Sequence, residues 1–224
     1  MKVKTLLEGK PFMTEYGIVG YSTVVLIACD DEKNILYDCG SKGCALQLKE
    51  ALEKAGMKPE DITHVVISHL HFDHVGNLPL FSNAEILLNK IEWESANQTP
   101  DEWHSIQTLA YLEKRGNLRF VKEGEEVSVM ELPGHTPGLI GLRCGAETIL
   151  CSDAMKNRYE LWKNIPLMSQ NLEQSRKSIQ RIKENARYIY PGHDGMLDLL
   201  HENSDEYPAV TLRYADGRQI DIKA

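Results

Sequence analysis

Short apolar runs separated by polar turns fill much of the chain and predict β-strands. "YSTVVLIAC" (21–29) and "NILYDCG" (34–40) are rich in Val, Ile, Leu and Tyr, and the polar "DDEKN" between them predicts a hairpin turn. "THVVIS" and "AEILLN" have the length of buried strands. The same pattern predicts further strands at "LRFV" (118–121), "EVSVMELP" (126–133), "GLIGLRC" (138–144), "ETILCSD" (147–153) and "YIY" (188–190), and a closing hairpin over Asp216-Gly217 (209–224).

Three stretches have helical periodicity instead. Residues 41–61 predict a helix that Gly56 and Pro59 would end. Its inward positions would be Leu46, Leu48, Ala51, Leu52 and Ala55. Residues 90–117 predict a mostly helical insertion, either a packed unit with an exposed His104 or a lid. Residues 171–187 predict an amphipathic helix with Leu172, Ile179 and Ile182 inward.

Composition favours one soluble globular domain spanning residues 1–224. The chain has 224 residues, 42% hydrophobic and 26% charged, and no linker or repeat is visible. The longest apolar run, "VVLIAC" (24–29), is far too short to span a membrane. The N-terminus lacks the apolar stretch of an export signal, and the five cysteines form no C-x-x-C pair. We therefore expect a cytoplasmic protein with reduced thiols.

Net charge narrows the range of partners. The formal charge is −8 and the pI is about 5.5, so the chain is a poor general binder of polyanions. This favours a small-molecule substrate over nucleic acid, which a bound metal could still attract. Association into a homodimer stays open.

The residues that can carry chemistry gather directly after predicted strands. "SHLHFDHVGN" (68–77) holds four of them, and the others stand in "PGHTPG", after "TILCS" and in "PGHDG". Together they are His69, His71, Asp73, His74, His135, Asp153 and His193. His135 and His193 stand among Gly and Pro residues that fix a tight turn. Layered α/β folds place their chemistry at such strand ends.

The spacing of these residues fits two metal ions. His69 and His71 alternate along an extended segment, so both can face one ion, with His135 completing its set. Asp73, His74 and His193 would hold the second ion, with Asp153 as the bridge. Three or four protein ligands leave room for a water at each ion, as in catalytic sites. Imidazole and carboxylate ligands suit zinc, with manganese or iron as alternatives.

In these motifs the chain resembles the metallo-β-lactamase superfamily, over residues 22–195. The resemblance implies an α/β fold, a four-layered αβ/βα sandwich with the metals at one edge of its two sheets. "YDCG" is similar to the family's D-x-G turn, which would place Asp38 behind a metal-bound histidine and fix that ring.

Two branches of the superfamily are similar to this chain. "SHLHFDHVGN", "PGHTPG" and "SDA" resemble the N-acyl-homoserine lactonases, which have a Tyr shortly after the bridging Asp. Lys156 occupies that position here, and Tyr159 lies one turn further on. "HVGNLPLF" and "SRKSIQ" resemble small single-domain metallo-β-lactamase-domain proteins, some of them regarded as nucleases. In that case Lys156, Arg158 and Lys163 would meet phosphate.

The expected reaction is hydrolysis of an ester-type bond in a lactone, carboxylic ester or thioester. A hydroxide bridging the two ions would attack, and Asp73 would accept the water's proton. Lys156, Arg158 and Tyr159 are the candidate substrate contacts. The alternatives are a phosphodiesterase or nuclease of the same fold, a mononuclear-iron dioxygenase, and a metal-binding module without catalysis. Two ions per chain would favour the hydrolase, and a single iron the dioxygenase.

Overall fold

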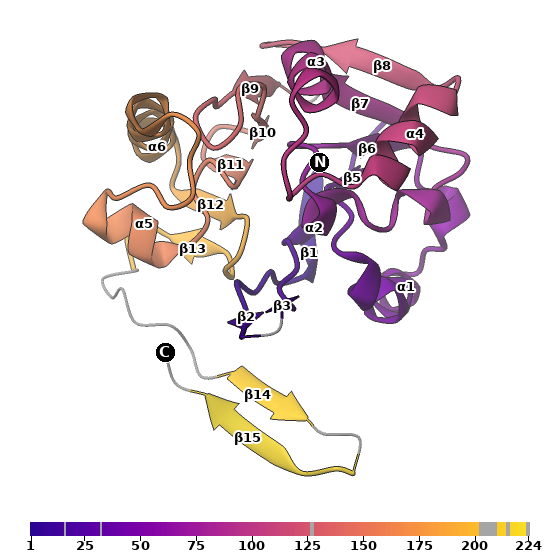
Figure 1. Ribbon diagram of the computed structural model, residues 1–224, viewed down its shortest axis with the longest axis horizontal. Coiled ribbons are helices and arrows are strands. Elements are labelled where there is room, and N and C mark those ends of the chain that lie inside the picture. Colours follow the sequence, from indigo (N-terminus) through magenta and orange to yellow (C-terminus); the bar gives the residue numbers. More distant parts are fainter. Residues whose placement is uncertain (16, 32, 126–127, 202–209, 214–215, 223–224) are drawn as a thin grey trace.

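Two β-sheets lie face to face with helices on their outer sides (Figure 1). This computed structural model describes residues 1–15, 17–31, 33–125, 128–201, 210–213 and 216–222. The first sheet has the strand order β1-β4-β5-β6-β7-β8, in which β5 to β8 run parallel. Its strands are β1 (Lys2–Leu7), β4 (Val24–Ala28), β5 (Asn34–Tyr37), β6 (His64–Val66), β7 (Glu85–Asn89) and β8 (Leu118–Val121).

The second sheet has the strand order β13-β12-β11-β10-β9. Its strands are β9 (Val129–Glu131), β10 (Ile140–Cys144), β11 (Thr148–Ser152), β12 (Tyr188–Pro191) and β13 (Leu197–Asp198). Among the described strand pairs of this sheet, β11–β12 is the parallel one and the others are antiparallel. A parallel pair needs a crossover, and the chain between β11 and β12 supplies it with two helices.

Helices cover the outer face of each sheet. Beside the first sheet lie α1 (Ala45–Lys54), α3 (Lys90–Gln98) and α4 (Ile106–Lys114), and beside the second α5 (Arg158–Lys163) and α6 (Leu172–Asn185) (Figure 1). Short turns complete the set: α2 (Phe72–Val75), η1 (Lys42–Cys44), η2 (Pro59–Asp61) and η3 (Leu78–Leu80). Side-chain oxygens of Asn89, Ser105, Asn157 and Asn171 accept backbone N–H groups at the starts of α3, α4, α5 and α6.

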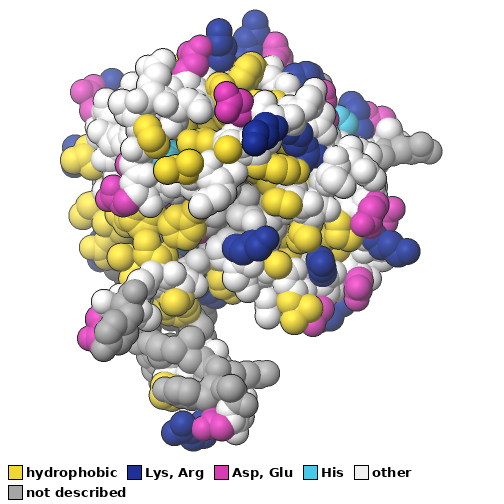
Figure 2. All heavy atoms as spheres, turned by 45° about the vertical axis from the view of Figure 1, so that its right-hand side comes forward, with side chains coloured by type: hydrophobic (Ala, Val, Ile, Leu, Met, Phe, Trp, Pro, Cys, Tyr) yellow, Lys and Arg dark blue, Asp and Glu magenta, His cyan; other side chains and the backbone are white. Residues whose placement is uncertain are grey.

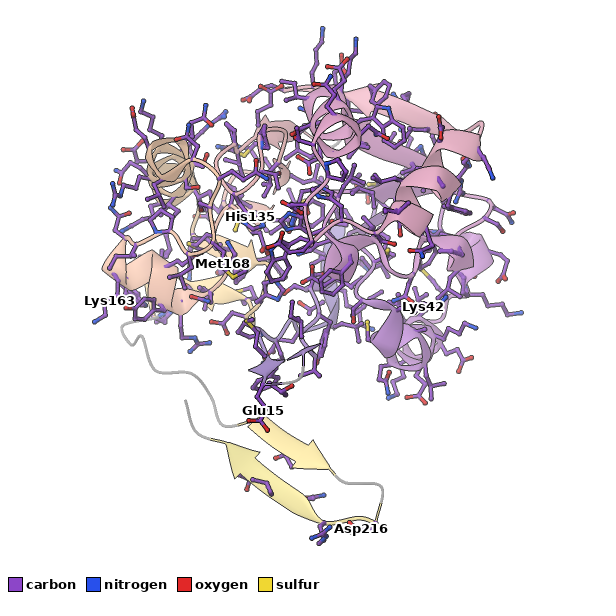
Figure 3. The ribbon with its side chains drawn as sticks, viewed as in Figure 1. Glu15, Lys42, His135, Lys163, Met168 and Asp216 are labelled. Atoms are coloured by element: carbon purple, nitrogen blue, oxygen red, sulfur yellow. The ribbon has the colours of Figure 1, made fainter. Side chains whose placement is uncertain are left out.

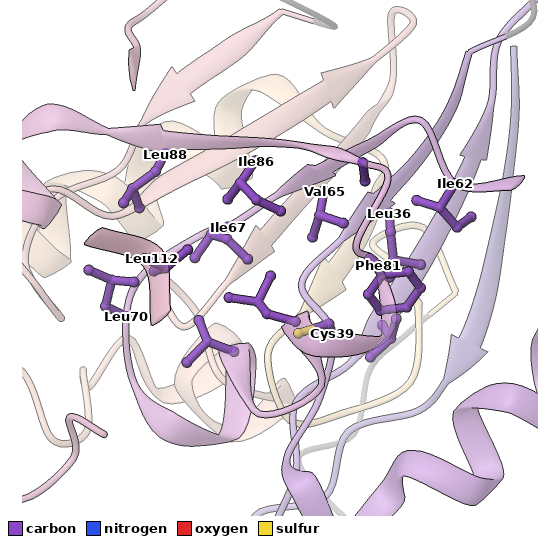
Figure 4. Close-up of a cluster of buried hydrophobic side chains, with 14 of the residues drawn as sticks. Leu36, Cys39, Ile62, Val65, Ile67, Leu70, Phe81, Ile86, Leu88 and Leu112 are labelled. Atoms are coloured by element: carbon purple, nitrogen blue, oxygen red, sulfur yellow. The ribbon is translucent and has the colours of Figure 1, made fainter. Parts of the chain in front are cut away.

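Strand alternation builds three apolar layers. Val25 and Ile27 face the second sheet, where they meet residues such as Ile140. Their neighbours Val24 and Leu26 face the helices on the other side. Figure 4 shows part of that outer layer, and a third layer lies between the second sheet and α6. Strands buried on both faces explain the continuous apolar runs and confirm the four-layered sandwich.

Several details differ from the sequence predictions. The helix predicted over residues 41–61 is shorter, since only 45–54 are α-helical. Leu46 is 63% exposed because it lies about 200° around the helix from Leu48, whereas Leu48 and Leu52 form the buried stripe. Leu172, the first residue of α6, is 51% exposed, because the buried face of that helix begins at Ser175.

Two hairpins stand at the N- and C-terminal ends. The first, β2 (Met13–Thr14) with β3 (Gly17–Ile18), is not apparent from periodicity because its strands are so short. The predicted C-terminal hairpin is confirmed as β14 (Val210–Arg213) and β15 (Gln219–Ile222), although residues 209, 214–215 and 223–224 lie outside the described part. It stands apart from the sandwich in Figure 1.

No helix in the described part of the chain combines the length and apolar character needed to cross a bilayer.

Candidate metal centre

Seven ligand-type side chains converge at one edge of the sandwich. Each of them comes from a segment that directly follows a strand: β6, β9, β11 or β12. All seven are at least nine-tenths buried: His69, His71, Asp73, His74, His135, Asp153 and His193. A Cβ on Gly192 would lie 1.9 Å from Asp153 Oδ1, so glycine at this point of "PGHDG" leaves room for the carboxylate.

The histidines and carboxylates fall into two groups. The first ligand group is His69, His71 and His135, whose donor atoms lie within 4.8 Å of one another. The second ligand group is Asp73, His74 and His193, with the same limit on spacing. Within the first group, His135 Nε2 lies 3.1 Å from His71 Nδ1. Within the second, Asp73 Oδ2 lies 3.4 Å from His193 Nε2 and 3.7 Å from His74 Nε2.

Asp153 stands between the two groups. Its Oδ2 lies 3.4 Å from His135 Nε2, on the first side. Its Oδ1 lies 3.4 Å from His74 Nε2 and 3.3 Å from His193 Nε2, on the second. One carboxylate oxygen therefore faces each group, which is the arrangement that a bridging ligand requires.

These separations suit metal coordination. Nitrogen ligands at about 2.0–2.1 Å from a tetrahedral zinc ion lie about 3.3 Å from one another, close to the distances found here. The Nε2 atoms of His69 and His74 and Oδ1 of Asp153 are buried without a hydrogen-bond partner in the described part of the chain. Buried polar atoms normally have partners, so their convergence on one point indicates a cation. The donor set fits two divalent ions.

Electrostatics differ between the two ligand groups. Burial lowers the pKa of His69 well below its usual value and that of His71 to about 3. Burial alone would also lower the pKa of His74, but nearby carboxylates, first of all Asp73 and Asp38, raise it well above its usual value. Asp153 likewise raises the pKa of His193 against the effect of burial.

Four of the five ligand histidines are held by a hydrogen bond from the ring nitrogen that faces away from the metal centre. His74 Nδ1 donates to Asp38 Oδ2 at 2.8 Å, and His69 Nδ1 lies 3.0 Å from Ser68 Oγ. The other two use backbone carbonyls: His135 Nδ1 donates to Met168 O (2.7 Å; Figure 3) and His193 Nδ1 to Tyr21 O (3.1 Å). Such bonds fix the ring orientation and leave the inner nitrogen free for a metal.

Asp38, expected behind a metal-bound histidine, connects several parts of the centre. Besides His74, its carboxylate accepts the Ser68 amide and hydroxyl at 2.8 Å each and the Ser152 hydroxyl at 2.9 Å. Asp38 and Ser152 both have a left-handed backbone, with φ of 57° and 47°. Non-glycine residues rarely adopt this conformation, and such strain clusters at functional sites.

A cavity of about 470 Å³ opens onto the metal centre. Five of the seven ligands line it: His71, Asp73, His135, Asp153 and His193. Much of the remaining wall is apolar, from the β2–β3 segment and two loops: Phe12, Met13, Ile18, Trp103 and Met168. Figure 2 shows hydrophobic side chains gathered on the surface above the C-terminal hairpin.

The three candidate substrate contacts are placed differently. Lys156 lines the cavity and is 6% exposed, with its Nζ 2.7 Å from Leu167 O. Arg158 does not line it and is held by the buried carboxylate of Asp194. Tyr159 also lies outside the cavity lining. The geometry favours Lys156 over the other two.

Two residues near the centre escaped the sequence analysis. Glu92 of α3 is buried and accepts the amides of Leu70 (2.9 Å) and Gly138 (3.2 Å), which ties two ligand-bearing loops together. His104, expected to be exposed, has a side chain only 4% exposed because it packs beside His71 and Asp101. No local pattern distinguishes these residues from solvated polar positions, so only the fold reveals them.

The chain belongs to the metallo-beta-lactamase superfamily, whose family model matches residues 17–193. It is 31% identical over 155 residues to an N-acyl homoserine lactonase of Bacillus cereus, covering 64% of this chain and 60% of the relative. It is 30% identical over 165 residues to metallo-beta-lactamase domain-containing protein 1 of Xenopus laevis, covering 71% and 65%. The chain thus spans about 60% of the length of the lactonases that it matches.

Solved structures show the same fold. A metallo-beta-lactamase-type protein of Thermotoga maritima superposes with a TM-score of 0.70 at 22% identity, covering 88% of this chain and 98% of that one. At this identity the likeness establishes the sandwich architecture alone.

Proposed function

We propose that the protein is a metal-dependent hydrolase that cleaves an ester-type bond, in a lactone, carboxylic ester or thioester. The observation that carries this proposal is the cavity, whose floor is formed by five ligands of the metal centre. When bound, two divalent ions, zinc in preference to manganese or iron, would lower the pKa of a shared water so that it can attack near pH 7. The similarity to lactonases supports the same reaction class.

Two side chains have roles beyond holding metal. Asp73 lines the cavity, and its Oδ2 faces His193 within the second ligand group. Its other carboxylate oxygen can take the proton of the attacking water. Lys156 lines the same cavity, with Nζ 3.8 Å from Asp153 Oδ2. Its ammonium can donate to the substrate carbonyl oxygen as negative charge develops there.

The apolar wall indicates a substrate with an apolar substituent. Met13, Ile18 and Met168 are exposed to solvent at the cavity by 63%, 37% and 53%. Covering them with an acyl chain would remove apolar surface from water on both partners. Each buried methylene contributes about 0.8 kcal/mol, so kcat/KM should rise about fourfold per added methylene until the wall is filled.

A phosphodiester substrate is less well supported. Among the described residues that line the cavity, Lys156 is the one Lys or Arg, while Asp101 and Glu102 add negative charge. Arg158, which could have met phosphate, is committed to Asp194. A polyanion would therefore meet repulsion at the rim in a chain of net charge −8.

The test joins metal analysis to a substrate panel of N-acyl lactones, aryl esters, thioesters and a phosphodiester. We expect about two ions per chain, loss of activity on metal removal, and ester turnover that changes little between 50 and 200 mM salt. Lys156→Met should lower kcat for the ester. Lys163→Met on α5, outside the cavity lining, is the matched control and should not.

Three outcomes would overturn the proposal. Phosphodiester cleavage without ester turnover would favour the phosphodiesterase alternative. The rate of that cleavage should then fall steeply with salt. A single iron per chain would favour the dioxygenase. Two bound ions with no turnover across the panel would favour a binding module.

A further inference from the structure

His71 lacks the support that the other four ligand histidines have. Its Nδ1 faces His135 Nε2 at 3.1 Å, so Nδ1 points into the first ligand group and Nε2 is the outer nitrogen. That Nε2 is buried and has no hydrogen-bond partner among the described residues. A metal-bound imidazole almost always donates its outer N–H to an acceptor. The structure should therefore offer His71 an acceptor close by.

A histidine–carboxylate pair lies beside this ring. His104 Nδ1 is 2.7 Å from Asp101 Oδ1, and both residues stand in the loop between α3 and α4. The rings of His71 and His104 have centroids 5.3 Å apart and meet edge to face at 80°. One ring nitrogen of each histidine and a carboxylate oxygen of Asp101 lie within 4.8 Å of one another.

The backbone fixes this loop against the metal-bearing segment. His71 and His104 form an isolated antiparallel β-bridge, and the Phe72 amide donates to Trp103 O at 2.8 Å. Asp101 Oδ1 also accepts the Trp103 amide at 2.9 Å. The position of the pair relative to His71 is thus set by main-chain bonds and not by side-chain packing alone.

The tautomer of His104 leaves it a ring nitrogen that can accept the hydrogen bond from the outer N–H of His71. We assign the proton of His104 to Nδ1, because the Asp101 carboxylate oxygen at 2.7 Å requires a donor there. The Asp101 amide also lies near this nitrogen, but at the longer distance of 3.2 Å. Nε2 of His104 is then an acceptor, whereas metal-bound His71 has an N–H donor at Nε2. A ring nitrogen of His71 and one of His104 lie within 4.8 Å of each other, a span that one bridging water can close.

We propose that Asp101 and His104 are positioning residues for His71: they hold its outer N–H, directly or through one water, and so orient the ring toward the ion of the first ligand group. His104 acts on the metal only through His71, and Asp101 acts through His104. The inference rests on the metal centre and not on the reaction, so failure of the proposed hydrolysis would leave it standing.

The test compares His104→Leu, which removes the acceptor, with His104→Gln, which keeps one. Zinc affinity is measured by chelator competition, and the ¹⁵N shift of His71 Nε2 reports its hydrogen bond in the zinc-loaded protein. His104→Leu should weaken the ion of the first ligand group roughly 10- to 100-fold and shift the His71 signal. His104→Gln should recover much of the loss. Asp101→Asn should give a smaller loss, and serves if His104→Leu fails to fold.

A matched control is available elsewhere in the chain. His201 Nδ1 bonds Asp198 Oδ2 at 2.8 Å, the same pairing at a side chain 73% exposed, and His201→Leu should change neither zinc affinity nor the His71 signal. Wild-type affinity and an unmoved His71 signal in both His104→Leu and Asp101→Asn would refute the proposal. Binding of a third ion that these variants lose would also overturn it, because the pair would then be a metal site itself.

Discussion

The two ligand groups of the metal centre differ in charge although they share Asp153. The first ligand group consists of three histidines whose pKa values burial lowers, His135 with a further contribution from the Lys156 ammonium. The second contains Asp73, and its histidines have raised pKa values because carboxylates surround them. Without metal, the lowered pKa values favour neutral rings with open lone pairs in the first group, while the raised pKa values in the second favour protonated rings, whose protons a metal must displace.

The hydrogen-bond partners behind the ligand histidines also differ in charge between the two groups. His74 is held by the Asp38 carboxylate, whereas His69 is held by the Ser68 hydroxyl and His135 by a backbone carbonyl. A carboxylate behind the ring strengthens the ligand and also favours its protonated form. The histidines of the second group are thus more basic ligands, but protons compete more strongly with the metal for them. The histidines of the first group can bind metal at lower pH.

The largest expected effect comes from removing the residue that the groups share. Asp153→Ala should lose at least one ion per chain and most activity, because each group loses an anionic oxygen. The loss should exceed the roughly 10- to 100-fold typical of residues that only support a ligand. Metal content after gel filtration and turnover on the best ester check this.

Asp194→Asn provides the control for loss of a buried carboxylate as such, since Asp194 pairs with Arg158 and is outside both groups. Two ions and full activity in Asp153→Ala would contradict the shared-ligand assignment.

Removing the charge of Asp38 should have a smaller effect, and it should weaken metal binding more at the second ligand group than at the first. Asp38→Asn removes the charge behind His74 while tolerating the left-handed φ of 57°, since Asn also adopts this conformation. Affinity for the ion of the second ligand group should fall roughly 10- to 100-fold, with a lesser change at the first. Cobalt titration followed by visible absorption measures both. Equal losses at the two groups would mean that Asp38 acts on the whole centre through Ser68.

The convergence of the seven side chains could be predicted from the sequence because much of its geometry is local. His69 and His71 face one way through strand alternation, and strand ends place His135, Asp153 and His193 at one edge once the sheets form. The same logic gave the sandwich, since its buried strands are visible as apolar runs.

What the sequence did not predict depends on contacts between distant loops. Arg158 meets Asp194, 36 residues away, and His104 reaches His71 through a loop of irregular backbone. No periodicity specifies such pairs, because tertiary packing and not local conformation brings the side chains together. The β2–β3 wall of the cavity escaped for a related reason, since strands of two residues leave no pattern.

The pH dependence of metal binding should sharpen the comparison. Protons on His74 and His193 compete with the metal at pH values below their raised pKa values, so affinity at the second ligand group should fall by about tenfold per pH unit for each proton displaced. The first ligand group should change little between pH 7 and 6, since its pKa values are lowered. Calorimetry in buffers of different ionisation enthalpy counts the protons released. Equal release at both groups would contradict the difference in charge.

The smallest effect should come from the Ser152 hydroxyl, which lies between Asp38 and Ser68. Ser152 Oγ lies 2.9 Å from Asp38 Oδ2 and 2.8 Å from Ser68 Oγ, so it contacts the supports of both His74 and His69. Ser152→Ala removes this hydroxyl and the hydrogen bond that it donates to Asp38, at a net cost of about 0.5–1.5 kcal/mol, equivalent to roughly 2- to 10-fold in affinity. Because Asp38 remains charged and bonded to His74, the loss should be smaller than in Asp38→Asn and shared by both ions. Chelator competition on the two variants side by side measures this, and a loss confined to one group would show that the hydroxyl supports that side alone.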